Sequence, residues 1–173
     1  MKPITSAEFR SMFRPGTRAW HLELRDTYRV EDEDVPFDLW LRGIPDDFAW
    51  RNDWLSFISE VTSAGTRVER LRIVTEPLSD YMRWAMELDP GNIEAGEDVR
   101  YLPRAQVAER TLPGEDCWLF DDRLLVLSLF KPDGRGAGYA VEDDPEQLNL
   151  YRATRNDLWP RAVPHAVYRP ATT

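Results

Sequence analysis

Two adjacent carboxylates, Asp121 and Asp122, stand between two strongly apolar runs in the segment CWLFDDRLLVLSLF, residues 117–130. Paired carboxylates can hold a metal ion or act as a general base. A turn between two antiparallel strands explains the pair as well, because aspartate tolerates turn geometry and accepts hydrogen bonds from nearby backbone N–H groups. The second run is apolar at both parities, which is typical of a strand buried on both faces. We therefore predict a hairpin turn rather than a catalytic or metal-binding pair.

A second group of polar residues centres on arginine. Arg70 and Arg72 share one parity of a strand expected at 66–75, and Arg100 falls in the next expected strand, at 97–102. If these strands are neighbours, the three guanidinium groups line one face or end of the sheet, where they could bind an anion or a partner's carboxylate. The candidate ligand-binding residues are Arg70, Arg72, Tyr81, Glu97 and Arg100.

The same arginines also have a purely structural explanation, in which they form ion pairs inside the protein. Glu69, Glu97 and Asp98 lie in the same two strands and are available as partners. Buried guanidinium groups need such partners, because an unpaired buried charge is strongly unfavourable. The sequence leaves both alternatives open, an anion site and an internal network.

Other chemical motifs are weak in this chain. The two histidines, His21 and His165, have no metal-site spacing to one another or to Cys117, the only cysteine. Cys117 is expected to be a buried packing residue. The glycines of GRGAG, residues 134–138, follow PDG and fit a hairpin turn better than a phosphate-binding loop. The sequence predicts no catalytic residue, no metal site and no cofactor.

The elements before residue 90 are expected to alternate between helices and strands. Residues 5–14 predict a short helix capped by Thr5 or Ser6. Residues 18–26 alternate between apolar and polar types, which predicts a half-buried strand with His21 on its wetter face. Two amphipathic helical patterns follow within residues 31–65.

The later part of the chain predicts a mixed sheet. Strand, helix and strand in succession predict a parallel crossover, and three runs after residue 115 predict an antiparallel meander. Asp144 and Pro145 mark the start of a closing helix. We therefore expect an α/β or α+β fold with a mixed β-sheet flanked by helices, in a single domain at 1–163, followed by a loosely ordered tail at 164–173. The expected strands are 66–75, 97–102, the two within 117–130, and 134–143. The expected helices in this part are 78–88 and 143–162.

Composition limits the partners. The 173 residues carry 31 acidic and 22 basic side chains, for a net charge of −9, which opposes nonspecific attraction to nucleic acid. No apolar run approaches the roughly 20 residues needed to cross a bilayer, and no secretory leader is recognisable, so a cytoplasmic location is expected.

An acidic run next to aromatic residues offers a candidate protein-binding surface. Residues 31–34 are all acidic, and aromatic side chains recur in the helical patterns that follow. Helix capping and core packing explain the same residues without a partner. The candidate partner-binding residues are Asp32, Asp34, Trp40 and Trp50.

Four segments in fixed order give the chain a family resemblance that covers roughly residues 9–162. The chain resembles a domain-of-unknown-function family of small actinobacterial proteins, often encoded beside Xre-type helix-turn-helix regulators. The resemblance implies a regulatory or partner-binding role. The segments are VERLRIVTEPLSDYMRWAMEL, NIEAGEDVRYLPR, CWLFDDRLLVLSLF and DDPEQLNLYRATRNDLW.

That family is also distantly similar to phospholipase-D-like half domains, whose His-x-Lys motif supplies a nucleophile and a phosphate-binding lysine. This chain departs from the motif, because Glu23 stands two residues after His21 and Val167 two residues after His165. We expect a non-enzymatic cytoplasmic regulatory protein that binds a partner protein, plausibly a helix-turn-helix transcription regulator. The alternative is a small-anion or nucleotide sensor, or a divergent phosphodiester enzyme.

Overall fold

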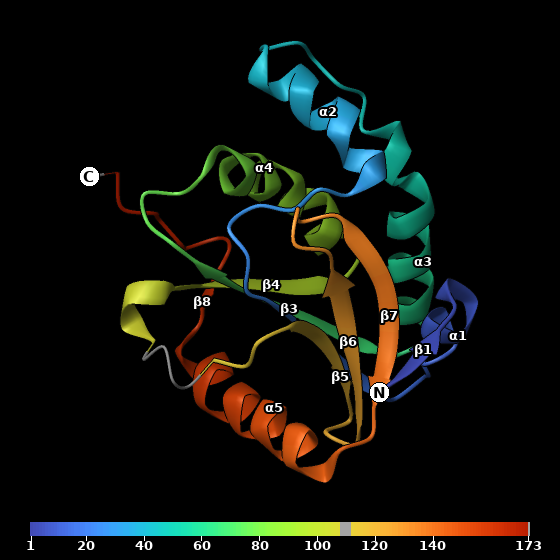
Figure 1. Ribbon diagram of the computed structural model, residues 1–173. Coiled ribbons are helices and arrows are strands. Elements are labelled where there is room, and N and C mark those ends of the chain that lie inside the picture. The colour runs from blue at the N-terminus through green and yellow to red at the C-terminus, as the bar shows by residue number, and fades with distance from the viewer. Residues whose placement is uncertain (108–111, 173) are drawn as a thin grey trace.

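An eight-stranded mixed sheet forms the centre of the protein and carries helices on both faces (Figure 1). The computed structural model describes residues 1–107 and 112–172. Within these residues no helix is long and apolar enough to cross a membrane. The strands are β1 Lys2–Ile4, β2 Arg18–Glu23, β3 Arg67–Val74, β4 Glu97–Pro103, β5 Asp116–Phe120, β6 Leu124–Phe130, β7 Gly136–Glu142 and β8 Val163–Pro164. The α-helices are α1 Ser6–Arg10, α2 Glu31–Leu41, α3 Asn52–Ser63, α4 Asp80–Glu94 and α5 Pro145–Leu158.

The strand order β1-β7-β6-β5-β2-β3-β4-β8 joins a parallel part to an antiparallel part. β2, β3 and β4 are parallel neighbours, and α4 makes the crossover from β3 to β4. β5, β6 and β7 form an antiparallel meander that joins the parallel strands where β5 pairs with β2. The prediction of a mixed sheet with a parallel crossover, a meander and a closing helix is confirmed.

The turn between β5 and β6 lies where the sequence predicts it. Asp121 and Asp122 both have left-handed backbone conformations, with φ of 50° and 57°. Two successive residues with positive φ match the twist of a two-stranded hairpin, and aspartate tolerates this conformation better than most residues. The paired carboxylates are thus turn residues, as predicted.

Helix boundaries follow local capping chemistry. Thr5 and Glu8 form a reciprocal capping box at the start of α1. Asp144 caps α5, where its side chain accepts a hydrogen bond from the backbone N–H of Glu146, and Pro145 occupies the first turn. Both helix starts were predicted from the sequence.

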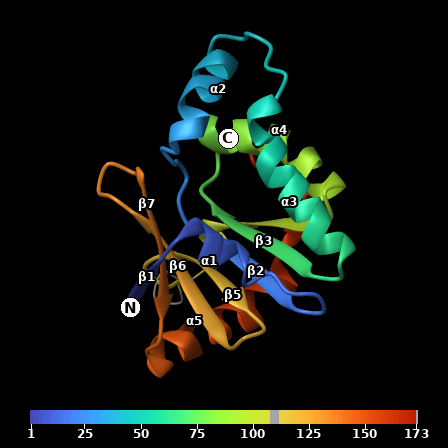
Figure 2. The same cartoon turned by 90° about the vertical axis from the view of Figure 1, so that its right-hand side faces the viewer.

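The two faces of the sheet are covered by different helices (Figure 2). α5 packs on one face, where Tyr151 and Leu158 join an apolar cluster with Leu22 and Leu71. α2, α3 and α4 lie over the other face, and α4 contributes Trp84 to the apolar cluster there. Because strand side chains alternate between faces, each central strand divides its residues between these two layers.

The C-terminal segment differs from the predicted loose tail at 164–173. β8 pairs antiparallel with β4, and the ring of Tyr168 stacks on Tyr101 with centroids 4.6 Å apart. The Tyr168 hydroxyl donates a hydrogen bond to Glu76 (2.6 Å). The prolines that suggested a loose segment are compatible with a short edge strand, and a buried tyrosine fixes the segment to the domain.

Candidate ligand-binding pocket

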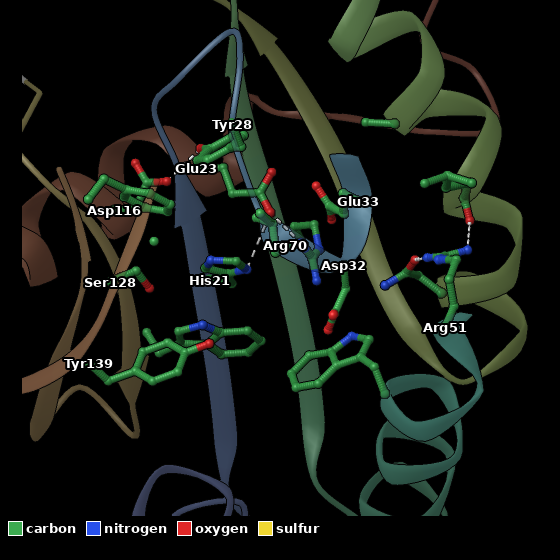
Figure 3. Close-up of a pocket in the computed structure, with 18 of the residues that line it drawn as sticks. His21, Glu23, Tyr28, Asp32, Glu33, Arg51, Arg70, Asp116, Ser128 and Tyr139 are labelled. Carbon is green, nitrogen blue, oxygen red and sulfur yellow. Dashed lines mark hydrogen bonds and ion pairs between the residues drawn. The ribbon is translucent and has the colours of Figure 1, made fainter. Parts of the chain in front are cut away.

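A pocket of about 490 Å³ lies between the sheet and the layer of α2, α3 and α4 (Figure 3). Its floor comes from β2, β3, β5 and β6, and α4 supplies much of the facing wall. The aromatic residues that line it are Tyr28, Trp50, Trp54, Tyr81, Trp118, Phe130 and Tyr139. A cavity of this size with aromatic walls and a few polar groups is typical of small-molecule sites.

Strand register determines which side chains meet on the pocket floor. His21 of β2 is opposite Arg70 of β3 on one side and Trp118 of β5 on the other. Two residues further along β2, Glu23 is opposite Arg72. Because residues of one parity share a face, these side chains form two adjacent rows across the sheet.

Glu23 pairs with both floor arginines. Its carboxylate bridges Arg70 and Arg72, one through each oxygen. Arg70 also donates through Nε to Glu97 (2.7 Å), and Arg72 donates to Asp89 (3.1 Å). All five side chains are at least nine-tenths buried. The arginines are therefore already neutralised by the protein's own carboxylates. Of the partners expected from the sequence, Glu97 pairs with Arg70 and Asp98 pairs with Arg100, whereas Glu69 pairs with Arg18 and Arg155.

The pKa of Arg70 shows that this network favours the charged form. Burial alone lowers the pKa of a guanidinium, but Glu97 and Glu23 outweigh that effect and raise the pKa of Arg70 above its usual value. Asn92 extends the network, because it donates to Glu97 (2.6 Å) and accepts from Arg51.

His21 lies in the pocket floor with its side chain 12% exposed, so it is on the wetter face of β2 as predicted, although that face is largely covered. Its ring stacks on Trp118 with centroids 4.1 Å apart, and Nδ1 lies 3.6 Å from Glu23 Oε1. Burial and the nearby Arg70 and Arg72 lower the pKa of His21 well below 6.5. The face is less exposed than the alternating pattern suggested, because the layer of α2, α3 and α4 covers this central strand. His21 is thus a neutral ring near neutral pH.

Three pocket carboxyl groups, those of Asp32, Glu33 and Asp116, have no ion-pair partner within the described residues. The Tyr28 hydroxyl donates to Asp116 (2.5 Å), and the backbone N–H of Leu24 also donates to it (2.9 Å). Glu33 of α2 accepts from the Tyr81 hydroxyl (2.6 Å). Burial raises the pKa of Asp116 to about 7 and also raises the pKa of Glu33.

The pocket brings together most, but not all, of the ligand-binding residues predicted from the sequence. Arg70, Arg72 and Tyr81 line it, and Glu97 lies behind Arg70. Arg100 lies elsewhere. It is opposite Leu71 in the register, so it points to the other face of the sheet, where its guanidinium lies 4.2 Å from the ring centre of Trp159.

The predicted partner-binding residues do not form one surface. Asp32 lines the pocket, while Asp34 is exposed. Trp40 packs on the α4 side and donates through its indole N–H to Glu87 (2.8 Å). Trp50 stacks near Trp84, with ring centroids 5.9 Å apart. The two tryptophans therefore belong to the packing between α4 and the segments that cover it.

The turn carboxylates lie outside the pocket. The Asp121 side chain accepts from the backbone N–H of Arg18 (2.8 Å), and Asp122 forms an ion pair with the Arg18 side chain (2.5 Å). These contacts tie the β5–β6 turn to the start of β2. Among the residues that the structure describes, no group of three or more His, Cys, Asp or Glu side chains could hold a metal ion.

Sequence reasoning did not select Glu23, Glu33 or Asp116 as site residues. One signal was available for Asp116, because it has the same parity as Trp118 and Phe120 in a strand that is buried throughout. A carboxyl group at such a position is unusual and requires a local reason. Glu33 gave no comparable signal, since it lies within a run of four acidic residues.

Comparisons with known proteins give a family but no function. A family model described as "Domain of unknown function (DUF6879)" matches residues 7–170. No curated protein matches the chain. A solved structure of TrmBL2, described as an archaeal chromatin protein with a novel mode of DNA binding, is similar with a TM-score of 0.43 and 12% sequence identity. The match covers 94% of this chain but 52% of that chain, and a likeness this low supports no argument about function.

Proposed function

This chain belongs to the DUF6879 family, and we propose that it is a non-enzymatic domain that binds a small organic molecule in the pocket over β2, β3 and β5. The observation that carries the proposal is the pocket itself, a space of about 490 Å³ with aromatic walls around a hydrogen-bonded polar floor. Ligand sites usually combine a mostly apolar lining with a small number of placed polar groups.

The polar groups of the floor are suited to holding a ligand rather than to breaking a bond. His21 is kept neutral, but its Nδ1 is buried and has no hydrogen-bond partner within the described residues. A nucleophile needs an adjacent base in hydrogen-bond reach, and the nearest carboxylate, Glu23, is engaged by two arginines. The expectation of a non-enzymatic protein therefore stays our proposal.

The proposed similarity to phospholipase-D-like domains gives the alternative of a divergent phosphodiester enzyme. That chemistry needs a histidine and a phosphate-binding lysine in one site. His21 lines the pocket, but the two lysines of the chain are Lys2 and Lys131, and neither lines it. Binding without cleavage is the simpler proposal for this set of residues.

Filling the pocket tests the proposal. Ser128 is a buried floor residue whose side chain makes no hydrogen bond among the described contacts. Ser128→Leu therefore fills part of the pocket without breaking a hydrogen bond. We expect small aromatic compounds that shift the indole NMR signals of Trp50, Trp54 and Trp118 in the wild type to bind Ser128→Leu at least about tenfold more weakly.

The control is Ser56→Leu, the same change on the exposed side of α3, which should leave binding unchanged. The screen should contain cationic, neutral and anionic compounds in equal numbers. If no compound shifts the pocket signals of the wild type, or if Ser128→Leu binds as well as the wild type, the pocket is not a ligand site.

A second candidate function, binding of a basic partner protein, is supported by α2 and the loop after it. Five large apolar side chains are exposed within residues 30–48, including Val35 at 69% and Leu41 at 52%. Acidic residues surround them. Such a surface matches a basic partner by charge complementarity. The exposed apolar residues are Val30, Val35, Leu41, Ile44 and Phe48.

The family resemblance suggests a helix-turn-helix regulator encoded beside the gene as the partner to test. Asp34→Lys reverses one charge on this exposed surface, and we expect it to weaken binding of that regulator several-fold, with the largest loss at low salt. Surface plasmon resonance at two salt concentrations measures the effect. Glu146→Lys, in the first turn of α5 across the sheet, is the matched control, because Glu146 is exposed as Asp34 is. If the wild type does not retain the regulator at low salt, this candidate is wrong.

A further inference from the structure

We propose that the ligand of this pocket is a flat organic cation, such as an aromatic amidine or amine, with its charged nitrogen at the Glu33 side of the pocket and its ring among the aromatic walls. This inference rests on the proposed function and adds the chemical class of the ligand. The sequence analysis offered an anion or a nucleotide as the alternative ligand. An anionic and a cationic ligand have opposite charges, so binding experiments can distinguish them.

The pocket has more acidic than basic side chains, which favours a ligand with positive charge. Five acidic and four basic side chains line it, and the carboxylates of Asp89 and Glu97 reach two of the same arginines from behind. With every carboxyl ionised the site has three more negative than positive groups, and it still has two more when Asp116, whose pKa is about 7, is protonated. A ligand with positive charge reduces this imbalance, whereas an anion increases it.

The arginines are not available to an anion without disrupting the floor. Arg70 and Arg72 each pair with two carboxylates, and they share Glu23. A phosphate that displaced Glu23 would leave a buried carboxylate without its partners, which is strongly unfavourable. The same two arginines that suggested an anion site in the sequence therefore oppose one in the structure.

Glu33 and Asp116 remain as hydrogen-bond acceptors for a cation. Figure 3 shows them on either side of Glu23, with Glu33 on the α2 side and Asp116 on the meander side. Only one oxygen of Glu33 has a described hydrogen bond, from Tyr81, so the other is available to an N–H donor. A charge-assisted hydrogen bond to a buried carboxylate is shorter and stronger than a neutral one.

The aromatic lining supports the same class of ligand. Trp54 reaches the pocket from the start of α3, and Trp50 from the 3₁₀ turn before it. Trp118 and Tyr139 reach it from the sheet. Aromatic faces attract organic cations, and the attraction grows as water is excluded. A flat cation can thus use the walls for stacking and the carboxylates for orientation.

The test uses three compounds of one shape and three charges: benzamidine, benzamide and benzoate. Isothermal titration measures each affinity at pH 7.5, and the indole NMR signals of Trp50, Trp54 and Trp118 locate binding. We expect benzamidine to bind at least about tenfold more tightly than either of the others. Adenosine monophosphate serves as the nucleotide probe, and we expect it not to bind the pocket.

Glu33→Gln identifies the charged contact. It keeps the size and the hydrogen bond with Tyr81, and we expect it to weaken benzamidine binding about tenfold while leaving benzamide unchanged. The matched control is Glu31→Gln, an exposed residue at the first position of the same helix, which should change neither affinity.

The outcomes separate this inference from the proposed function. Tighter binding of benzoate, benzamide or adenosine monophosphate at the same tryptophans would keep the pocket as a ligand site and overturn the cationic class. Equal loss of benzamidine binding in Glu31→Gln and Glu33→Gln would also overturn the assigned contact. If no compound of any charge shifts those tryptophan signals, the proposed function itself is wrong.

Discussion

Replacing Glu23 with glutamine is expected to lower the free energy of unfolding by about 3–5 kcal/mol. The change is nearly isosteric, but it removes the one negative charge that, within the part of the chain that the structure describes, Arg70 and Arg72 share. Each guanidinium keeps one carboxylate partner, Glu97 or Asp89, but glutamine has an NH2 donor where Glu23 has its second oxygen, so a buried guanidinium donor loses its acceptor. Most single substitutions cost less than this because they do not break a buried network of ion pairs and hydrogen bonds.

Urea unfolding at pH 7 measures the effect of Glu23→Gln. The control is Asp98→Asn, which breaks the ion pair of Arg100 near the surface, where the Asp98 side chain is 44% exposed. Surface pairs are worth little, so this variant should stay within about 1 kcal/mol of the wild type. A Glu23→Gln protein as stable as the Asp98→Asn control would show that the bridge does not hold the floor together.

Asp116→Asn is expected to stabilise the protein at pH 8 by about 4 kcal/mol and to have little effect near pH 4. Burial raises the pKa of Asp116 to about 7 in the folded protein from its usual value of 3.8. The folded state therefore binds this proton more tightly than the unfolded state, and stability is lost as the pH rises from about 4 through 7. Each unit of pKa difference is worth about 1.4 kcal/mol, and asparagine imitates the protonated acid.

Denaturant unfolding of both proteins at intervals from pH 4 to pH 8 gives the measurement. The groups that face Asp116 are Glu23, Tyr28 and Arg25. Burial and the nearby Arg70 and Arg72 lower the pKa of His21 well below 6.5, so His21 is neutral at the upper end of this range, where the wild type is expected to lose stability. If the free energy of unfolding changes with pH in the same way in the wild type and in Asp116→Asn, with no additional loss in the wild type above pH 6, the pKa of Asp116 is not raised by burial.

The fold was predictable where local rules decide the structure. The Thr5 cap, the Asp144 cap and the aspartate turn at residues 121–122 all depend on neighbours in the sequence, and all appear as expected. The parallel crossover follows equally directly from the order of strand and helix. These features need no knowledge of distant contacts.

The site was only partly predictable because strand register is a long-range property. The sequence shows that Arg70 and Arg72 share a face, but it does not show which residues of β4 share that face with them. Arg100 is opposite Leu71, and a shift of one residue would have placed it beside the other arginines. Because the sequence does not give the register between β3 and β4, Arg100 was wrongly included among the ligand-binding residues.

Burial of polar residues was the second obstacle. His21 and Glu23 alternate with apolar neighbours in β2, which usually indicates a solvated face. Here that face is the pocket floor, because α4 and its neighbours cover it. Burial of Tyr168 was not predicted either. The proline-containing segment at the C-terminus was expected to be loose, but the buried ring of Tyr168 anchors it.

Crystal structures of the protein soaked with benzamidine and with adenosine monophosphate would show directly which charge the pocket accepts. We expect the amidinium group within hydrogen-bond distance of the Glu33 carboxylate, with Glu23 still bridging Arg70 and Arg72. A nucleotide phosphate bound to Arg70 or Arg72, with Glu23 displaced from them, would contradict this expectation.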